Sequence, residues 1–391
     1  MTKTALIGSG RAGAGRASGA LAALLALSLA VPAAAGGLDL GLPAVSGYLE
    51  ESLAGQATAE QNIYYLLSHL RLRVDFPEQE GLSARGEFDL YGLGTQPFSL
   101  SVSGGNRVNI PATSTAAAVD RLYFRLAGGD TQATIGRQRI PWGNGTAFAP
   151  ADFFNPPNPV DPKGPRQGAD GVMVRRALGP LGYVAAAAAY VNPGAASLPG
   201  MASALLTAGG SGSSAGGLSG SVKAATHLGQ TDLGLGWGYD AANARHVAFA
   251  EAQGDLGVGW HAALARLWSD ADGEKWSGAA GVDYSFGGKY VGMLEYAAGP
   301  LPGDVGLDGQ PRENPRWAVG ANYLASEVAS LGAHVLLDTA PGAPSTAVVT
   351  FTQTLTSALD LSLRLAYPFG EASGAAALWG GAGEVKVRYS F

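Results

Sequence analysis

The C-terminal segment 384–391 constrains the fold more than any other part of the chain, because polar and apolar residues alternate along it. The polar positions are Glu384, Lys386, Arg388 and Ser390, and the apolar positions are Val385, Val387, Tyr389 and Phe391. A period of two predicts a β-strand with one polar face and one apolar face. The same alternation recurs at Arg71 and Arg73, at Arg85, Glu87 and Asp89, at Arg121 and Arg125, and at Arg364. These repeats predict an all-β chain.

Alternating strands occur both in soluble sandwiches and in transmembrane antiparallel β-barrels, and the composition favours the barrel. The 59 glycines are roughly twice the average share. Only 14% of the residues are charged, against about 25% in ordinary soluble domains. No segment after the N-terminal region has about 20 consecutive apolar residues, so a helical membrane protein is not expected.

Eighteen strands are expected, starting near residues 45, 62, 82, 119, 130, 168, 181, 217, 230, 243, 255, 275, 288, 316, 329, 346, 358 and 381. Connections after even-numbered strands should be short periplasmic turns, and those after odd-numbered strands can be long external loops. The long connections, about 95–118, 140–167, 192–216, 299–315 and 368–380, all follow odd strands. A missed or invented hairpin would keep this parity, so sixteen strands stay open. Both chain ends are then periplasmic.

The N-terminal region has the organisation of a secretory signal. Lys3, Arg11 and Arg16 precede an apolar run from Ala20 to Val31, and small residues follow up to Ala35. We therefore expect a signal peptide over 1–35, a short periplasmic segment over 36–44, and the barrel over 45–391. Loss of the signal changes the net charge from −6 to −9, since it removes three of the 25 basic residues and none of the 31 acidic ones. An acidic chain gives no support for nucleic-acid binding.

Aromatic residues near the expected strand ends agree with a membrane barrel. They include Trp237 and Tyr239, Tyr284 and Phe286, Trp317 and Tyr323, and Tyr389 and Phe391. Amphipathic rings favour the headgroup level of a bilayer, where they form girdles around barrels. In a soluble barrel the same rings would belong to the core.

Two parts of the chain resemble known outer-membrane barrels. The terminal Phe391 resembles the C-terminal signal of bacterial outer-membrane barrels, which implies reading by the barrel-assembly machinery. Residues 135–176 contain an R-Q…WG…P-x-D-x-x-N-P…D pattern that resembles uncharacterised porin-like barrels and, more distantly, the alginate-export type. The resemblance implies outer-membrane lipid and small-molecule solutes as partners. Porin-like barrels are often trimers, so a homotrimer stays open.

The segment 140–167 is rich in proline, which favours extended backbone of defined shape. It is the third external loop, and in general porins the third loop folds into the lumen and narrows it. The resemblance thus implies a constriction loop here. The candidate constriction residues are Trp142, Asp152, Phe153, Asn155, Asp161, Lys163 and Arg166.

Polar residues of the clearest strands are expected to line the pore. The candidates are Arg71, Arg73, Arg85, Glu87, Asp89, Arg121, Arg125, Arg364, Lys386 and Arg388. Because the last strand must close against the first, the basic residues gather on one wall. Two interpretations stay open: an arginine array that attracts anions, and cross-strand pairs with Asp and Glu that brace the wall.

No catalytic, cofactor-binding or metal-binding residues are expected. The five histidines are scattered singly, and the chain has no cysteine. The sequence favours a porin-like outer-membrane channel for small hydrophilic solutes, and the arginine-array interpretation would add a mild anion preference. Two alternatives are an export channel for a polysaccharide or another partner-delivered substrate, and a structural or adhesive surface barrel.

Overall fold

A computed structural model describes the chain over 42–58, 62–95, 98–102, 106–110, 113–159, 166, 168–191, 217–271, 273–302, 312–341, 343–370 and 379–391. All regular structure in these ranges is β-strand, and none of the described residues forms a helix long and apolar enough to cross a membrane. The expected signal peptide and most of the segment 36–44 lie outside the described residues.

The described strands form one large sheet and one small hairpin. The large sheet consists of β1 (Ala44–Thr58), β2 (Asn62–Gln79), β3 (Leu82–Thr95), β6 (Thr113–Gly128), β7 (Thr131–Gln138), β8 (Ala169–Ala177), β9 (Gly182–Val191), β10 (Gly217–Leu228), β11 (Thr231–Asp240), β12 (Arg245–Asp255), β13 (Gly259–Ser269), β14 (Gly273–Phe286), β15 (Tyr290–Ala298), β16 (Arg316–Ser326), β17 (Ala329–Asp338), β18 (Ser345–Thr356), β19 (Leu359–Phe369) and β20 (Trp379–Ser390). The hairpin consists of β4 (Phe98–Val102) and β5 (Asn106–Ile110).

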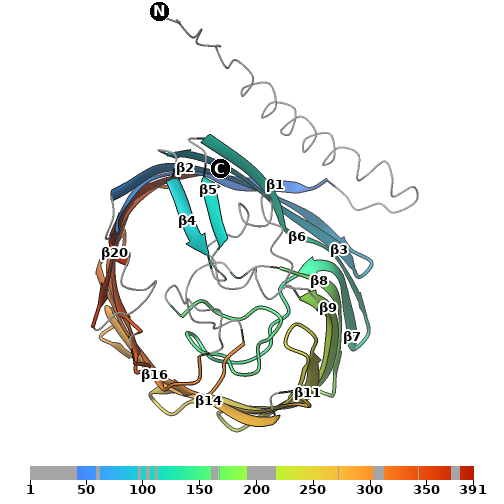
Figure 1. Ribbon diagram of the computed structural model, residues 1–391. Helices are drawn as coiled ribbons and strands as arrows, with labels where there is room; N and C mark the ends of the chain where they lie inside the picture. The colour runs from blue at the N-terminus through green and yellow to red at the C-terminus, as the bar shows by residue number, and fades with distance from the viewer. Residues whose placement is uncertain are drawn as a thin grey trace, which may run out of the picture.

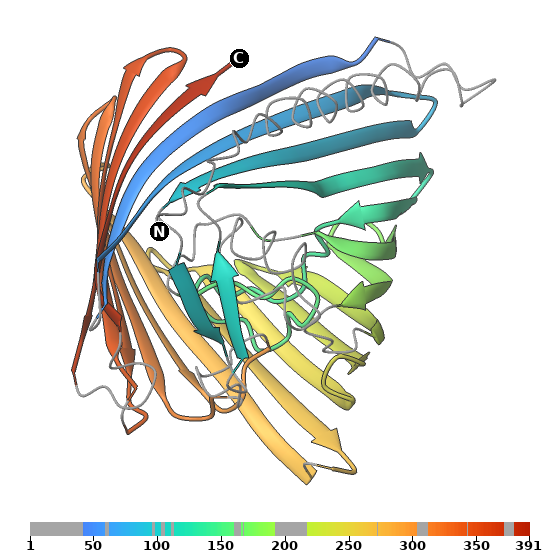
Figure 2. The same cartoon turned by 45° about the horizontal axis from the view of Figure 1, so that its top comes forward.

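The large sheet is a closed antiparallel barrel of 18 strands, as the sequence predicts. Each strand pairs with the next one in the sheet, and β20 pairs with β1 with Leu49 opposite Tyr389. Backbone bonds in both directions between Gly47 and Phe391 extend this closing pair to the last residue. Closure gives the backbone groups at both edges of every strand a hydrogen-bond partner, and this allows a sheet to span a lipid bilayer. Figures 1 and 2 show the ring of strands, with the green loop segment inside it.

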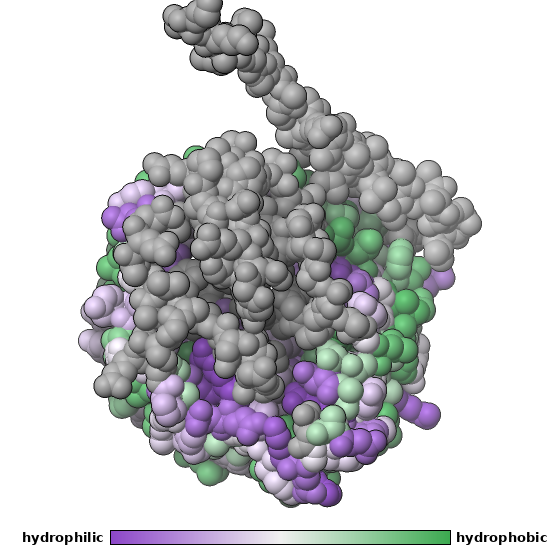
Figure 3. Space-filling model, viewed as in Figure 1, coloured by the Kyte–Doolittle hydropathy of each residue, from purple (hydrophilic) through white to green (hydrophobic). Residues whose placement is uncertain are grey.

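The two faces of the barrel differ in the way that the alternation predicts. Large apolar side chains are exposed on the outer face, among them Leu53, Leu122, Val222, Leu264 and Val385. Hydrophobic residues accordingly occupy much of the visible circumference, while hydrophilic ones gather towards the mouth (Figure 3). An apolar surface that continues around a barrel needs lipid to cover it, so the fold is that of a transmembrane β-barrel.

The connections follow the expected parity. Tight turns join β6 to β7 and β10 to β11, where Gly129 and Gly229 adopt φ values of 55° and 65° that favour glycine. The long connections follow β3, β7, β9, β15 and β19, which are odd-numbered in the order of the barrel. The connection expected over about 95–118 is shorter at its end, because β6 already begins at Thr113, and it contains the β4–β5 hairpin.

Candidate functional site

The described residues of the loop 139–168 between β7 and β8, namely 139–159, 166 and 168, lie inside the barrel against one wall (Figure 1). Its polar contacts reach several strands. Trp142 Nε1 donates to Ser221 Oγ on β10 over 2.9 Å, and Asn144 Nδ2 donates to Ala252 O on β12 over 2.7 Å. Farther along, His334 Nε2 on β17 lies 2.9 Å from Pro159 O. The predicted constriction loop is therefore fixed along the wall from β10 to β17.

Apolar packing accompanies these contacts. Phe153 and Phe154 pack in a cluster with the inward alanines of β9, and Phe148 is buried among residues of β14 to β17. Small residues on the wall make room for the rings. A Cβ on Gly238 of β11, for example, would lie 2.9 Å from Phe153 Cζ. The loop thus has its own dry core within a polar lumen.

A buried ion pair organises the middle of the loop. Asp152, fully buried, accepts a hydrogen bond from Asn155 N over 2.9 Å and lies 3.1 Å from Arg166 Nη1. Asn155 in turn accepts from Ile140 N over 2.7 Å, which ties the two ends of the turn together. Burial raises the pKa of Asp152 to about 7, because removal from water outweighs the stabilising hydrogen bond and Arg166.

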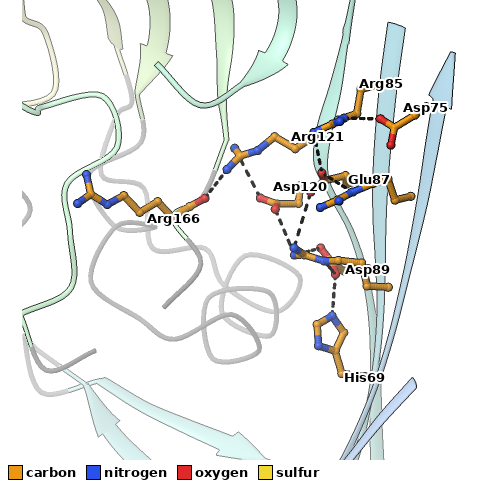
Figure 4. Close-up of polar contacts among 10 residues, drawn as sticks. His69, Asp75, Arg85, Glu87, Asp89, Asp120, Arg121 and Arg166 are labelled. Atoms are coloured by element: carbon orange, nitrogen blue, oxygen red, sulfur yellow. Dashed lines mark hydrogen bonds and ion pairs between the residues drawn. The ribbon is translucent and has the colours of Figure 1, made fainter. Parts of the chain in front are cut away.

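The opposite wall holds a network of charged pairs, drawn in part in Figure 4. On β2 and β3 the inward residues face each other in register as Arg71 with Asp89, Arg73 with Glu87, and Asp75 with Arg85. Arg71 binds Asp89 through two hydrogen bonds of 2.7 and 2.9 Å. Arg73 Nε donates to Glu87 over 3.0 Å, and Arg85 also pairs with Asp75. Cross-strand pairs of opposite charge brace a sheet.

The network continues on both sides of this hairpin. Arg388 of β20 donates two hydrogen bonds to Glu50 of β1, and Lys386 lies 3.3 Å from the same carboxylate. On β6, Asp120 lies 3.1 Å from Arg71 Nη2. Most basic side chains of the wall therefore have acidic partners, as the bracing interpretation expects.

A smaller set of basic side chains has no such partner. Among the described residues, no acidic group lies within ion-pair distance of Arg125, Arg139 or Arg364. Arg125 contacts the ring of Tyr123 at 5.8 Å, and both Arg125 and Arg139 are exposed. These side chains are the free positive charges of the described lumen.

The loop and the charged wall meet at Arg121. Its Nη2 donates to Arg166 O over 2.7 Å, and the only acidic group of the described residues within ion-pair distance is Asp120, 3.9 Å away (Figure 4). Gly168 permits this approach, since a Cβ there would lie 2.8 Å from the Arg121 guanidinium. Arg121 thus joins the wall to the base of the loop.

The structure brings most of the candidate residues to the lumen. Trp142, Asp152, Phe153, Asn155 and Arg166 belong to the inward loop. Of the remaining loop candidates, Asp161 and Lys163 lie outside the described residues. The ten candidate pore-lining residues occupy inward strand positions.

Two groups of residues were not identified from the sequence. Asp120 and Glu50 are acidic partners of the wall, and Ser221 and Glu295 are wall residues that hold the loop. Asp120 lies at a break in the β3–β6 register, between the pairs of Glu87 with Arg121 and of Phe88 with Val119. Period-two alternation misassigns such a residue, because a bulge shifts the facing. No group of three or more potential ligands for a metal ion occurs within the described ranges.

Comparisons with known proteins agree with this fold. No family model matches the chain, and no curated protein matches it. Solved structures do: OccK7 (OpdD) of Pseudomonas aeruginosa is 10% identical with a TM-score of 0.59, over 89% of this chain and 98% of that one. The outer membrane protein opdK of P. aeruginosa is 12% identical with a TM-score of 0.58, over the same shares. A BenF-like porin of Pseudomonas fluorescens Pf-5 is 10% identical with a TM-score of 0.57, again over 89% and 98%. The chain therefore shares the fold of porin barrels.

Proposed function

We propose that this chain is an outer-membrane channel through which small hydrophilic solutes pass passively, and that it is not an enzyme. The observation that carries the proposal is the loop 139–168, which is fixed along one wall of a closed barrel opposite a charged wall. An 18-stranded barrel is wide enough for water unless loops fill it. The loop then determines the size limit, and the charged wall orients the solute.

Small organic anions are the solute class that we propose as preferred. The support is the set of free basic side chains, Arg125, Arg139 and Arg364, together with Arg121 at the base of the loop. Guanidinium groups bind carboxylates through matched pairs of donors. One structural neighbour, OpdK, was solved with vanillate, an aromatic carboxylate. The paired charges of the wall contribute less to the preference for anions, because the fields of the two partners largely cancel.

The remaining assignments belong to the same proposal. The N-terminal 1–35 is a secretory signal cleaved near Ala35, and Phe391 is the residue read by the barrel-assembly machinery. Support for the latter is that Phe391 pairs with Gly47 through two backbone hydrogen bonds and thereby completes the β1–β20 closure. The mature chain resides in the outer membrane, where lipid covers its apolar surface.

Single-channel recording of the refolded mature chain in a planar bilayer under a salt gradient tests the function. We expect discrete steps and a reversal potential whose sign indicates anion preference. Added vanillate or benzoate should block the current, and a neutral analogue such as benzyl alcohol is the control. A folded, heat-modifiable barrel without any conductance would refute a passive channel and favour the export or surface-barrel alternatives.

A further inference from the structure

The carboxylate of Glu295, on the inner face of β15, is almost completely removed from solvent by the loop 139–168. It accepts hydrogen bonds from three successive backbone N–H groups of the loop. The distances are 2.7 Å from Thr146 N, 2.5 Å from Ala147 N and 3.2 Å from Phe148 N. His261 Nε2 of β13 lies 2.5 Å from the same carboxylate. Glu295 is thus the acidic side chain of the described wall that contacts the loop backbone most extensively.

The loop is shaped to receive this carboxylate. Successive backbone N–H groups that converge on one point form a concave anion-binding nest. Gly145 begins the turn, and a Cβ at this position would overlap Phe148 O, so the turn requires glycine. Phe148 ends it and is fully buried against the wall. The nest therefore depends on the local chain geometry, and Glu295 fills it.

We propose that Glu295 is the positioning residue of the constriction loop: the loop carries an anion-binding nest, and a carboxylate of the barrel wall occupies it permanently. The consequence for conductance rests on the proposed channel function, whereas the consequence for loop position does not. The nest also explains how a wall rich in alanine and glycine holds the loop at one height. Its other polar contacts with the wall come from amide, hydroxyl, indole, imidazole and guanidinium groups, which do not require an anion.

Glu295→Ala empties the nest, and a small carboxylate from solution should then be able to refill it. Loss of even one hydrogen bond to a charged group shifts a local equilibrium by about tenfold or more, so the loop should become mobile. Formate or acetate should restore its position in Glu295→Ala. Neither should restore it in Glu295→Gln, because the amide still fills the site and directs N–H groups at the donors. Glu274→Gln is the matched control, since Glu274 is exposed and pairs with Arg266 away from the loop.

Loop position can be measured without conductance, because the chain has no cysteine. A spin label on Asn158→Cys should report an ordered loop in the otherwise native protein and in Glu274→Gln, and a mobile loop in Glu295→Ala. Formate or acetate, at constant ionic strength, should restore order in Glu295→Ala, and chloride should not. Heat-modifiable migration identifies the variants that fold, and Glu295→Gln tests the site if Glu295→Ala does not fold.

The same variants are then recorded in planar bilayers. We expect open-channel noise to rise about tenfold in Glu295→Ala and to return to the native level in acetate. An ordered loop in both folded Glu295 variants would overturn the inference, and so would a mobile loop in Glu295→Ala that neither formate nor acetate restores. A silent native channel with the expected label mobilities would instead refute the proposed function and leave the nest assignment standing.

Discussion

Replacing Trp142 by alanine tests how firmly the constriction loop is attached to the wall. Trp142 is 2% exposed, donates a hydrogen bond to Ser221, packs edge-on against Phe154 at 5.7 Å, and lies 6.0 Å from the ammonium of Lys223. Truncation of a buried tryptophan costs about 3–5 kcal/mol. Since 1.4 kcal/mol is a factor of ten, the detached population of the loop should rise by about a hundredfold to a few thousandfold.

The barrel itself should survive this change. Its strands are joined by a closed set of backbone hydrogen bonds that Trp142 does not contribute to, because the residue lies in the loop between β7 and β8. We therefore expect normal heat-modifiable migration together with a larger and noisier single-channel conductance. Ser221→Ala keeps the Trp142 ring but removes the hydrogen bond that it donates, worth about 1 kcal/mol, together with the bond from Ser221 Oγ to Trp237 O within the wall; it should raise the noise by about fivefold.

Trp276→Ala is the matched control, because Trp276 is 54% exposed on the outer face and does not face the lumen. Its loss should leave the conductance unchanged. The reasoning would be refuted by a folded Trp142→Ala channel with the native conductance and noise, or by equal effects of the Trp142 and Trp276 substitutions. Either result would mean that the loop is not held at Trp142.

Three further predictions concern charge. Because burial raises the pKa of Asp152 to about 7, the residue gains a proton as the pH falls through that value. Anion preference, measured by the reversal potential, should therefore rise between pH 8 and pH 6. Asp152→Asn should remove the part of this pH dependence that comes from Asp152. Replacing Arg121 and Arg125 together by glutamine should weaken anion preference, by up to about fivefold in permeability ratio for about 1 kcal/mol, and an unchanged reversal potential would contradict a role for them. Glu87→Gln should strengthen anion binding, measured as block by benzoate, because it leaves Arg73 without its bonded carboxylate.

The sequence predicted the barrel well because each strand can be recognised from its own residues. Alternation determines which face meets lipid, and glycine-rich turns separate the strands, so the eighteen strands and the parity of the loops follow from local patterns. The β4–β5 hairpin was missed although FSLSV and NRVNI flank Ser-Gly-Gly, a usual turn sequence. Its short strands were assigned to the connection 95–118, because the strand count and the loop parity were already complete without them.

The site was predicted only in part, since its contacts join residues that are distant in the chain. The pairs of Arg71 with Asp89 and of Arg73 with Glu87 could be predicted from the sequence, because the two residues of each pair are equally far from Glu80, where the hairpin turns with a φ of 50°. No comparable rule relates Glu295 to Ala147, which are 148 positions apart. Whether a lone inward glutamate binds a solute, a lysine or a loop backbone depends on where the loop lies.

The two walls of the lumen use charge in different ways, and the difference follows from burial. Glu295 and Asp152 are sealed from water and must have partners within the protein, so neither can bind a passing solute directly. On the opposite wall, the side chains of Arg73 and Arg388 remain 42% and 40% exposed although both are paired. Glu87 and Glu50 are themselves only 5% exposed and stay paired, so a passing carboxylate binds the exposed N–H groups of these hydrated guanidinium groups weakly and without displacing either glutamate. A wall of paired but exposed arginines therefore offers successive weak sites, which allow an anion both to enter and to leave.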